Sequence, residues 1–238
     1  MRRLALAVLA TILAWAAPAA AQAPMTPPPE PPPPPQVMPG PPQTTPPPPP
    51  QAMPPPPMDP TAHRHLGFYL HLDLGLGGLA SSASTPLGDA KLSGTGGSFS
   101  IAAGGAVSEN FILAGHVWGH SVSDPRVELG GQSATASGST VSLTGVGLDL
   151  TWYLMPSNVY FTVTPSITKL SVEYNGQTSD TENGLGLQLA VGKEWWVSDH
   201  WGIGLNGLVA ISSNKDKGTD PPTWSSSSFA ITFSATYN

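Results

Sequence analysis

The chain has 238 residues, a formal net charge of -6 and only 10% charged side chains, with 26 glycines, 29 prolines and no cysteine. Without cysteine there are no disulfides, thiolate metal sites or thiol nucleophiles. The small number of Lys and Arg residues argues against a nucleic-acid partner, because a phosphate-binding face needs clustered cations. So few charges are also unlike the surface of an ordinary cytosolic enzyme.

Residues 1–23 have the pattern of a secretory signal peptide. Arg2 and Arg3 precede an apolar stretch over residues 4–17, and small residues around 19–23 offer a cleavage site. The alternative is a transmembrane helix, but the apolar run is short and proline follows it closely. The sequence therefore predicts export, and no later run is long enough for a membrane helix.

Residues 24–62 form a proline-rich segment with the proline runs 31–35, 46–50 and 54–57. Proline fixes φ and lacks the backbone donor, so we expect a disordered, extended polyproline II arm in the periplasm. At about 3.1 Å per residue it can reach on the order of 100 Å. It is either a passive spacer or a tether to peptidoglycan or a periplasmic protein.

Alternation with a period of two begins after His63 and continues to the C-terminus. In the run 68–76 every even position is large and apolar, whereas the odd positions carry Tyr, His, Asp and Gly. Side chains alternate faces along a strand, and residues two apart in a helix do not share a face. Similar segments lie near residues 98–107, 145–154, 159–167, 184–195, 201–209 and 229–237. With 111–120, whose facing stays open because both parities are apolar, this predicts eight strands.

The connections alternate in length. Turn-forming residues make short links at 108–110, 155–158 and 197–200. Long polar connections are expected near 78–96, 121–140, 171–183 and 211–228. Three short turns and four long loops predict an all-β, eight-stranded antiparallel transmembrane up-and-down β-barrel over residues 63–238, with both termini on the periplasmic, short-turn side.

A soluble sandwich or lipocalin-like barrel is the competing fold. Its outer face would be polar, but the less apolar face here is mostly Gly, Ala, Ser and Thr, which suits a narrow lumen better than a water-facing exterior. Aromatic residues also gather beside the short turns and the termini, as in the aromatic girdle of a membrane interface. The predicted girdle, which would contact outer-membrane lipids, comprises Phe68, Trp152, Tyr160, Trp195, Trp196, Trp201 and Tyr237.

The runs 145–158 (GVGLDLTWYLMPSN) and 191–202 (VGKEWWVSDHWG) resemble the outer-membrane β-barrel domain family, a broad group of small barrels like OmpA, OmpX and OmpW. The resemblance covers about residues 65–238 and implies the architecture and insertion by the barrel-assembly machinery, but no particular activity. Such barrels usually end on an aromatic residue. This chain departs from that pattern, because Asn238 follows Tyr237.

Polar residues on the predicted lumen face raise the question of catalysis. His and Asp together permit acid–base chemistry, so a lipid-modifying hydrolase or acyltransferase is one hypothesis. The other is an interior polar network, since buried carboxylates need partners, and we favour it, with no catalytic residue, metal or cofactor. The predicted lumen network comprises His71, Asp73, His116, Asp149, Glu194 and Asn206.

The sequence thus predicts a non-enzymatic protein of the cell outer membrane. It would contribute to envelope structure or form a narrow, porin-like passage, and acids facing the lumen would favour cations. Eight strands normally leave room only for side chains. A surface-loop binding or adhesion module is the alternative, followed by the lipid-modifying enzyme.

Overall fold

The computed structural model describes residue 63 and residues 65–238. The predicted signal peptide (1–23) and proline-rich segment (24–62) lie outside the described residues. Within the described part of the chain, none of the helices has the length and apolar character needed to cross a membrane.

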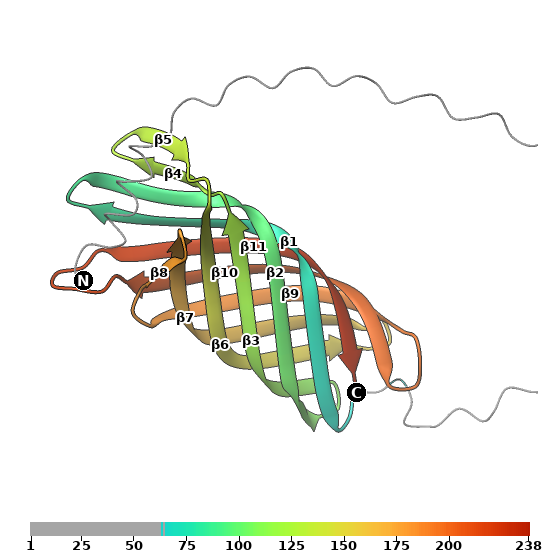
Figure 1. Cartoon of the computed structure of the whole chain (residues 1–238). Helices are drawn as coiled ribbons and strands as arrows, with labels where there is room; N and C mark the ends of the chain where they lie inside the picture. Colours follow the sequence, from blue (N-terminus) through green and yellow to red (C-terminus); the bar gives the residue numbers. More distant parts are fainter. Residues whose placement is uncertain (1–62, 64) are drawn as a thin grey trace, which may run out of the picture. The chain divides into compact units, whose positions relative to one another are not determined.

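Eight long strands form one closed antiparallel sheet, as predicted. In Figure 1 they lie side by side around a common interior, each next to its neighbour in the chain. The circle closes because β1 pairs with both β2 and β11. The strands are β1 (Phe68–Thr85), β2 (Gly88–Ser108), β3 (Phe111–Ser123), β6 (Ser139–Leu154), β7 (Val159–Tyr174), β9 (Gly184–Trp196), β10 (Trp201–Lys215) and β11 (Thr223–Tyr237).

The register keeps the two faces of the sheet distinct all the way around. Leu74 pairs with Phe233 on the outside, and Asp73 pairs with Ser234 on the inside. Outward apolar side chains are strongly exposed, Leu76 at 75% and Phe233 at 74%. Leaving such a side chain in water forgoes about 1.5–3 kcal/mol of burial, so this surface requires an apolar solvent. The exterior therefore fits lipid, and the soluble-barrel alternative fails.

Short turns link the strands at one end, which we call the short-turn end. They fall where the sequence predicts them, between β2 and β3, β6 and β7, and β9 and β10. Asn110 and Asn158 lie in two of these turns at positive φ (65° and 53°). Asparagine tolerates this left-handed conformation better than most residues.

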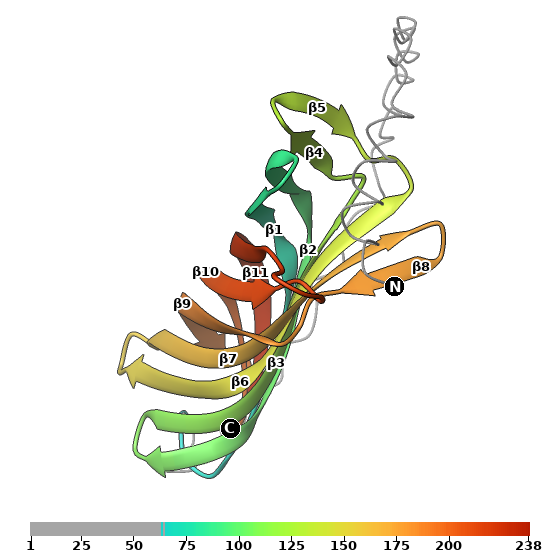
Figure 2. The same ribbon diagram turned by 90° about the vertical axis from the view of Figure 1, so that its left-hand side faces the viewer.

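The opposite end, which we call the hairpin end, differs from the prediction of long loops. Much of that sequence is β-structure, and β1 pairs with β2 continuously up to Thr85 and Gly88. Figure 2 shows further short strands projecting beyond the wall: β4 (Arg126–Leu129) and β5 (Gln132–Thr135) as a hairpin, and β8 (Gln177–Asp180) beside β7. Ser-, Gly- and Thr-rich sequence resembles a loop, but cross-strand pairing to an existing sheet edge extends it as strands.

The facing of residues 111–120, left open above, is decided by the register with β2 and β6. Ile112, His116 and Trp118 are buried and point inwards, whereas Leu113 and Val117 are exposed. Even-numbered residues of β3 therefore line the interior.

Two members of the predicted aromatic girdle do not face lipid. Tyr160 is 1% exposed and packs inside the barrel. Trp196 is partly buried, and its ring lies 5.2 Å from that of His65. Both lie at the predicted height, but strand parity turns them inwards. The others lie on the outer face, where Phe68, Trp152, Trp195 and Trp201 are exposed and Tyr237 packs between Phe68 and Trp201.

Candidate functional site: the polar network inside the barrel

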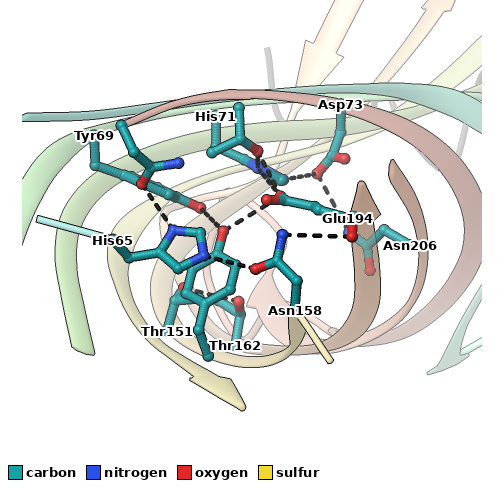
Figure 3. A network of polar contacts seen from close by, with 12 residues as sticks. His65, Tyr69, His71, Asp73, Thr151, Asn158, Thr162, Glu194 and Asn206 are labelled. Carbon is teal, nitrogen blue, oxygen red and sulfur yellow. Dashed lines mark hydrogen bonds and ion pairs between the residues drawn. The ribbon is translucent and has the colours of Figure 1, made fainter. Parts of the chain in front are cut away.

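All six predicted lumen residues point inwards and are buried. They form two groups. His71, Asp73, Glu194 and Asn206 belong to one network that involves β1, β9, β10 and β11. His116 and Asp149 form a separate pair between β3 and β6. Figure 3 shows the first group.

His71 lies between two carboxylates. Its Nε2 is 3.2 Å from Asp73 Oδ2, and its Nδ1 is 3.5 Å from Glu194 Oε1. Thr236 Oγ1 stands between them, 2.7 Å from His71 Nδ1, and donates its hydroxyl proton to Glu194 Oε1 at 2.5 Å. Because that single proton goes to Glu194, hydrogen bonds at both imidazole nitrogens require both of them to donate. His71 is then a buried cation between two acids.

Asp73 collects the largest number of donors in this network. Ser100 donates to Oδ2 at 2.9 Å and Thr232 donates to Oδ1 at 3.2 Å. The amide of Asn206 contributes a longer bond of 3.4 Å to Oδ2. A buried carboxylate without partners would be strongly destabilising, and these donors come from three different strands. Asp73 therefore ties β1 to β2, β11 and β10 along the inner wall of the barrel.

The second group is smaller. His116 Nδ1 lies 2.8 Å from Asp149 Oδ1, and the Thr164 hydroxyl donates to the same oxygen at 2.5 Å. Below it, the hydroxyls of Thr151 and Thr162 are 2.8 Å apart. This group ties β3, β6 and β7 together in the same way that the His71 network ties the strands on the other side.

Several network residues were not predicted from sequence. Tyr153 donates to Glu194 Oε1 at 3.3 Å and lies 3.4 Å from the hydroxyl of Tyr69. His65, before β1, accepts or donates through both ring nitrogens. Parity already placed Tyr69 and Tyr153 on the inner face, so that signal was available. Nothing in the alternation pattern identifies His65, which precedes the first strand.

Two hydroxyls of the network donate to its carboxylates, Thr236 to Glu194 and Ser100 to Asp73. The described residues also contain no group of three or more His, Cys, Asp or Glu side chains that could hold a metal. Most of the polar contacts join network residues to one another, although Glu194 Oε2 and Asn206 Oδ1 are buried without a hydrogen-bond partner.

Apolar layers fill the interior at both ends of the network. At the hairpin end a cluster built around Trp118, Leu143, Leu170 and Trp224 draws side chains from almost every barrel strand. At the short-turn end Tyr69, Tyr153 and Tyr160 pack with the side chains of β2 and β3. The network thus adjoins the apolar cluster on the hairpin side and shares Tyr69 and Tyr153 with the cluster on the short-turn side.

No family model and no curated protein matches this chain. Solved structures with a similar course of the chain include Neisserial surface protein A (20% identity, TM-score 0.44), which covers 72% of this chain and 96% of its own. The solid-state NMR structure of the outer membrane protein AlkL in lipid bilayers is 14% identical, with a TM-score of 0.44 and coverages of 73% and 90%. The outer membrane protease OmpT from Escherichia coli is 9% identical, with a TM-score of 0.42 and coverages of 72% and 96%.

The fold assignment rests on this chain's own strands and side chains. The sheet is closed by β1, its exterior is apolar, and its interior is polar between two packed layers. A closed barrel leaves no unpaired strand edge, which is what a sheet needs in order to span a bilayer. The chain therefore has the fold of a small, eight-stranded outer-membrane β-barrel.

Proposed function

We propose that this protein is a non-enzymatic, non-conducting barrel of the outer membrane with a structural role in the cell envelope. The observation that carries the proposal is the filled interior. Two clusters of buried side chains and the polar network that adjoins them lie in the space that a channel would need. Eight-stranded barrels generally have just enough interior for their own side chains.

The layer at the hairpin end is the stronger barrier. Trp118 is 1% exposed and donates from its indole nitrogen to Ser166 Oγ at 3.0 Å, which holds the ring over β6 between β3 and β7. Its ring covers Gly145, where an added Cβ would lie 2.4 Å from it. A hydrated ion cannot pass a close-packed apolar layer without displacing it. This supports a structural barrel over the narrow porin-like passage.

The polar network supports the same reading. A selectivity filter needs acids that face a water-filled path, whereas Asp73 and Glu194 are already engaged by His71 and by hydroxyl donors. Their charges stabilise the folded barrel by pairing with partners from other strands. We infer that they act as an interior core and that the protein performs no chemistry on a substrate.

Planar-bilayer conductance of the refolded protein tests the proposal, with heat-modifiable gel mobility to show that it is folded. We expect a folded, silent barrel. As a positive control, Trp118→Ala together with Leu170→Ala empties part of the hairpin-end layer and should produce measurable current. Discrete cation-selective steps in the unsubstituted protein, lost in Asp73→Asn, would contradict the proposal and favour a pore.

A second candidate function is surface binding by the hairpin end. The observation that favours it is the ordered projection of β4, β5 and β8 beyond the barrel wall. Arg126 pairs with Glu128 at 3.1 Å and donates to Ser133 at 3.0 Å, which stiffens the β4–β5 hairpin. Deletion of residues 126–135 should leave heat-modifiable folding intact. Loss of adhesion or ligand binding in that variant would establish the second function.

The proline-rich segment bears on how the barrel performs its structural role. We propose that it extends into the periplasm and contacts peptidoglycan or a periplasmic protein. Peptidoglycan pull-down of the protein with and without residues 24–60 tests this contact. Equal retention of the two forms would leave the segment as a spacer.

A further inference from the structure

His65 is buried completely, at 0% exposed, although it lies outside the strands. It stands between the proline-rich segment and β1, at the short-turn end. Its ring stacks on that of Tyr153, with centroids 3.4 Å apart and planes inclined by 18°. Figure 3 shows the imidazole inside the mouth of the barrel, surrounded by polar side chains.

Both ring nitrogens of His65 are hydrogen-bonded to distant parts of the chain. Nε2 lies 2.7 Å from Asn158 Oδ1 in the β6–β7 turn, and Nδ1 lies 2.9 Å from Asn238 Oδ1 after β11. We call His65, Tyr153, Asn158 and Asn238 the His65 anchor. It joins the residues before the first strand to the fourth barrel strand, to a turn and to the last residue of the sequence.

Each partner of His65 is itself held in place. The Asn158 amide donates to the backbone carbonyl of Glu194, and the Asn238 backbone N–H donates to the carbonyl of His200 at 2.9 Å. Tyr153 is tied to Glu194 through its hydroxyl. The anchor is therefore continuous with the interior network and with the short turns.

The position of the anchor determines which contacts resist a force that pulls on the chain before His65. The ladder between β1 and β11 begins at Leu70 and Tyr237, and the ladder between β1 and β2 begins at Phe68. Without the anchor, such a pull would act on the bond from Ala106 N–H to the Gly67 carbonyl and then on these first ladder bonds, which can open one at a time. With the anchor, a buried side chain must first leave a packed, hydrogen-bonded site.

We propose that the His65 anchor is a force-bearing attachment, by which the barrel holds the proline-rich segment against tension from the periplasm. The inference rests on the proposed envelope-structural function and names the residues that perform it. It also gives Asn238 a role, since its side chain closes the anchor by bonding to His65.

Trypsin provides the first test. Arg64 is the only Lys or Arg between Arg3 and Lys91, so cleavage after it separates the segment from the barrel. In the folded protein the bond joins Arg64 to the buried His65, and we expect it to be protected. His65→Ala and Asn238→Ala should each be cut about tenfold faster, since cleavage follows the population of the opened state.

Asn214→Ala is the matched control for this test. Asn214 is also a buried amide with two hydrogen-bonding contacts, to Thr168, but it lies at the hairpin end. Cleavage after Arg64 should be unchanged in this variant. If the unsubstituted folded protein is cut there as fast as the urea-unfolded chain, the anchor does not hold and the inference is wrong.

Single-molecule pulling from the N-terminus of the bilayer-inserted protein tests the force itself. The first rupture should occur at lower force in His65→Ala and Asn238→Ala than in the unsubstituted protein or in Asn214→Ala. Equal first-rupture forces in all four proteins would overturn the inference. Failure of the proposed function would instead appear as conductance, which this measurement does not probe, so the two outcomes are separable.

Discussion

Apolar packing stabilises one half of the barrel interior, whereas hydrogen bonds and ion pairs stabilise the other. At the hairpin end Trp118, Leu143 and Leu170 pack by shape, and many neighbours share each contact. Toward the short-turn end Asp73 and His71 depend on a few directional bonds to named partners. In the apolar half, the loss of stability grows with the side-chain volume that is removed. In the polar half, a buried charge that loses its partner destabilises the folded barrel strongly. The same barrel should therefore tolerate substitutions very unequally along its axis.

The largest expected effect is Asp73→Ala. It removes the acceptor of His71, Ser100 and Thr232 together and leaves the buried His71 with Glu194 as its remaining acidic partner. We expect the free energy of unfolding to fall by about 3–5 kcal/mol, measured by urea unfolding in lipid vesicles with tryptophan fluorescence. Asp89→Ala, an exposed residue in β2, is the control and should change stability by no more than about 0.5 kcal/mol. Equal effects of the two would remove the distinction between network and surface acids.

Leu143→Ala tests the apolar half at full truncation. Leu143 is completely buried beside Trp118, so its loss should cost about 2–5 kcal/mol, depending on how far the neighbours collapse into the space. The same urea titration measures it. Leu148→Ala, on the lipid-facing side of the same strand, should cost clearly less because its side chain is exposed. A larger loss at Leu148 would mean that lipid contact rather than interior packing dominates.

Thr232→Val removes one hydroxyl from the network at nearly constant volume. Thr232 is fully buried and donates to Asp73 Oδ1, so the carboxylate loses a donor that the valine methyl cannot replace. The expected cost is about 1–3 kcal/mol. In the double variant with Asp73→Asn the cost of Thr232→Val should shrink, because the two residues are coupled. Strict additivity would show that the bond contributes nothing.

Leu143→Met has the smallest expected effect. Methionine has a similar volume and can adapt to the shape of the site, so the free energy of unfolding should change by less than about 1.5 kcal/mol. This loss should be below that of Thr232→Val, although both substitutions keep side-chain volume nearly constant. The reverse order would break the comparison between a shape-packed half and a bond-directed half.

Predictions that depend on strand parity and on turn residues agree with the structure. The eight strands, the three short turns and the apolar exterior follow from alternation with period two and from residues such as Asn110 and Asn158. The height of Tyr160 and Trp196 along their strands predicts that they belong to the girdle. Whether a side chain faces lipid or the interior depends instead on strand parity. Tyr160 lies between the outward Val159 and Phe161, and one residue of offset reverses the face.

At the hairpin end the prediction of long loops is wrong, because much of that sequence forms strands. The abundance of Ser, Gly and Thr predicts a loop over residues 78–96, yet these residues pair from Gly78 with Thr95 to Thr85 with Gly88. Composition indicates weak intrinsic strand preference, but a strand that already has a neighbour can continue the ladder at low cost. Tertiary pairing, not local propensity, decided where these strands end.

The sequence by itself determined the period, and hence the number of strands, the lipid-facing side and which polar residues point inwards. Only the tertiary structure decided which of those residues meet. His71 contacts Glu194, and His65 contacts Asn238, because closure of the sheet brings β1 against β11 and a fixed register sets their height. Alternation specifies a face for each residue but not its neighbour on the opposite wall, since that neighbour depends on the shear of the whole barrel.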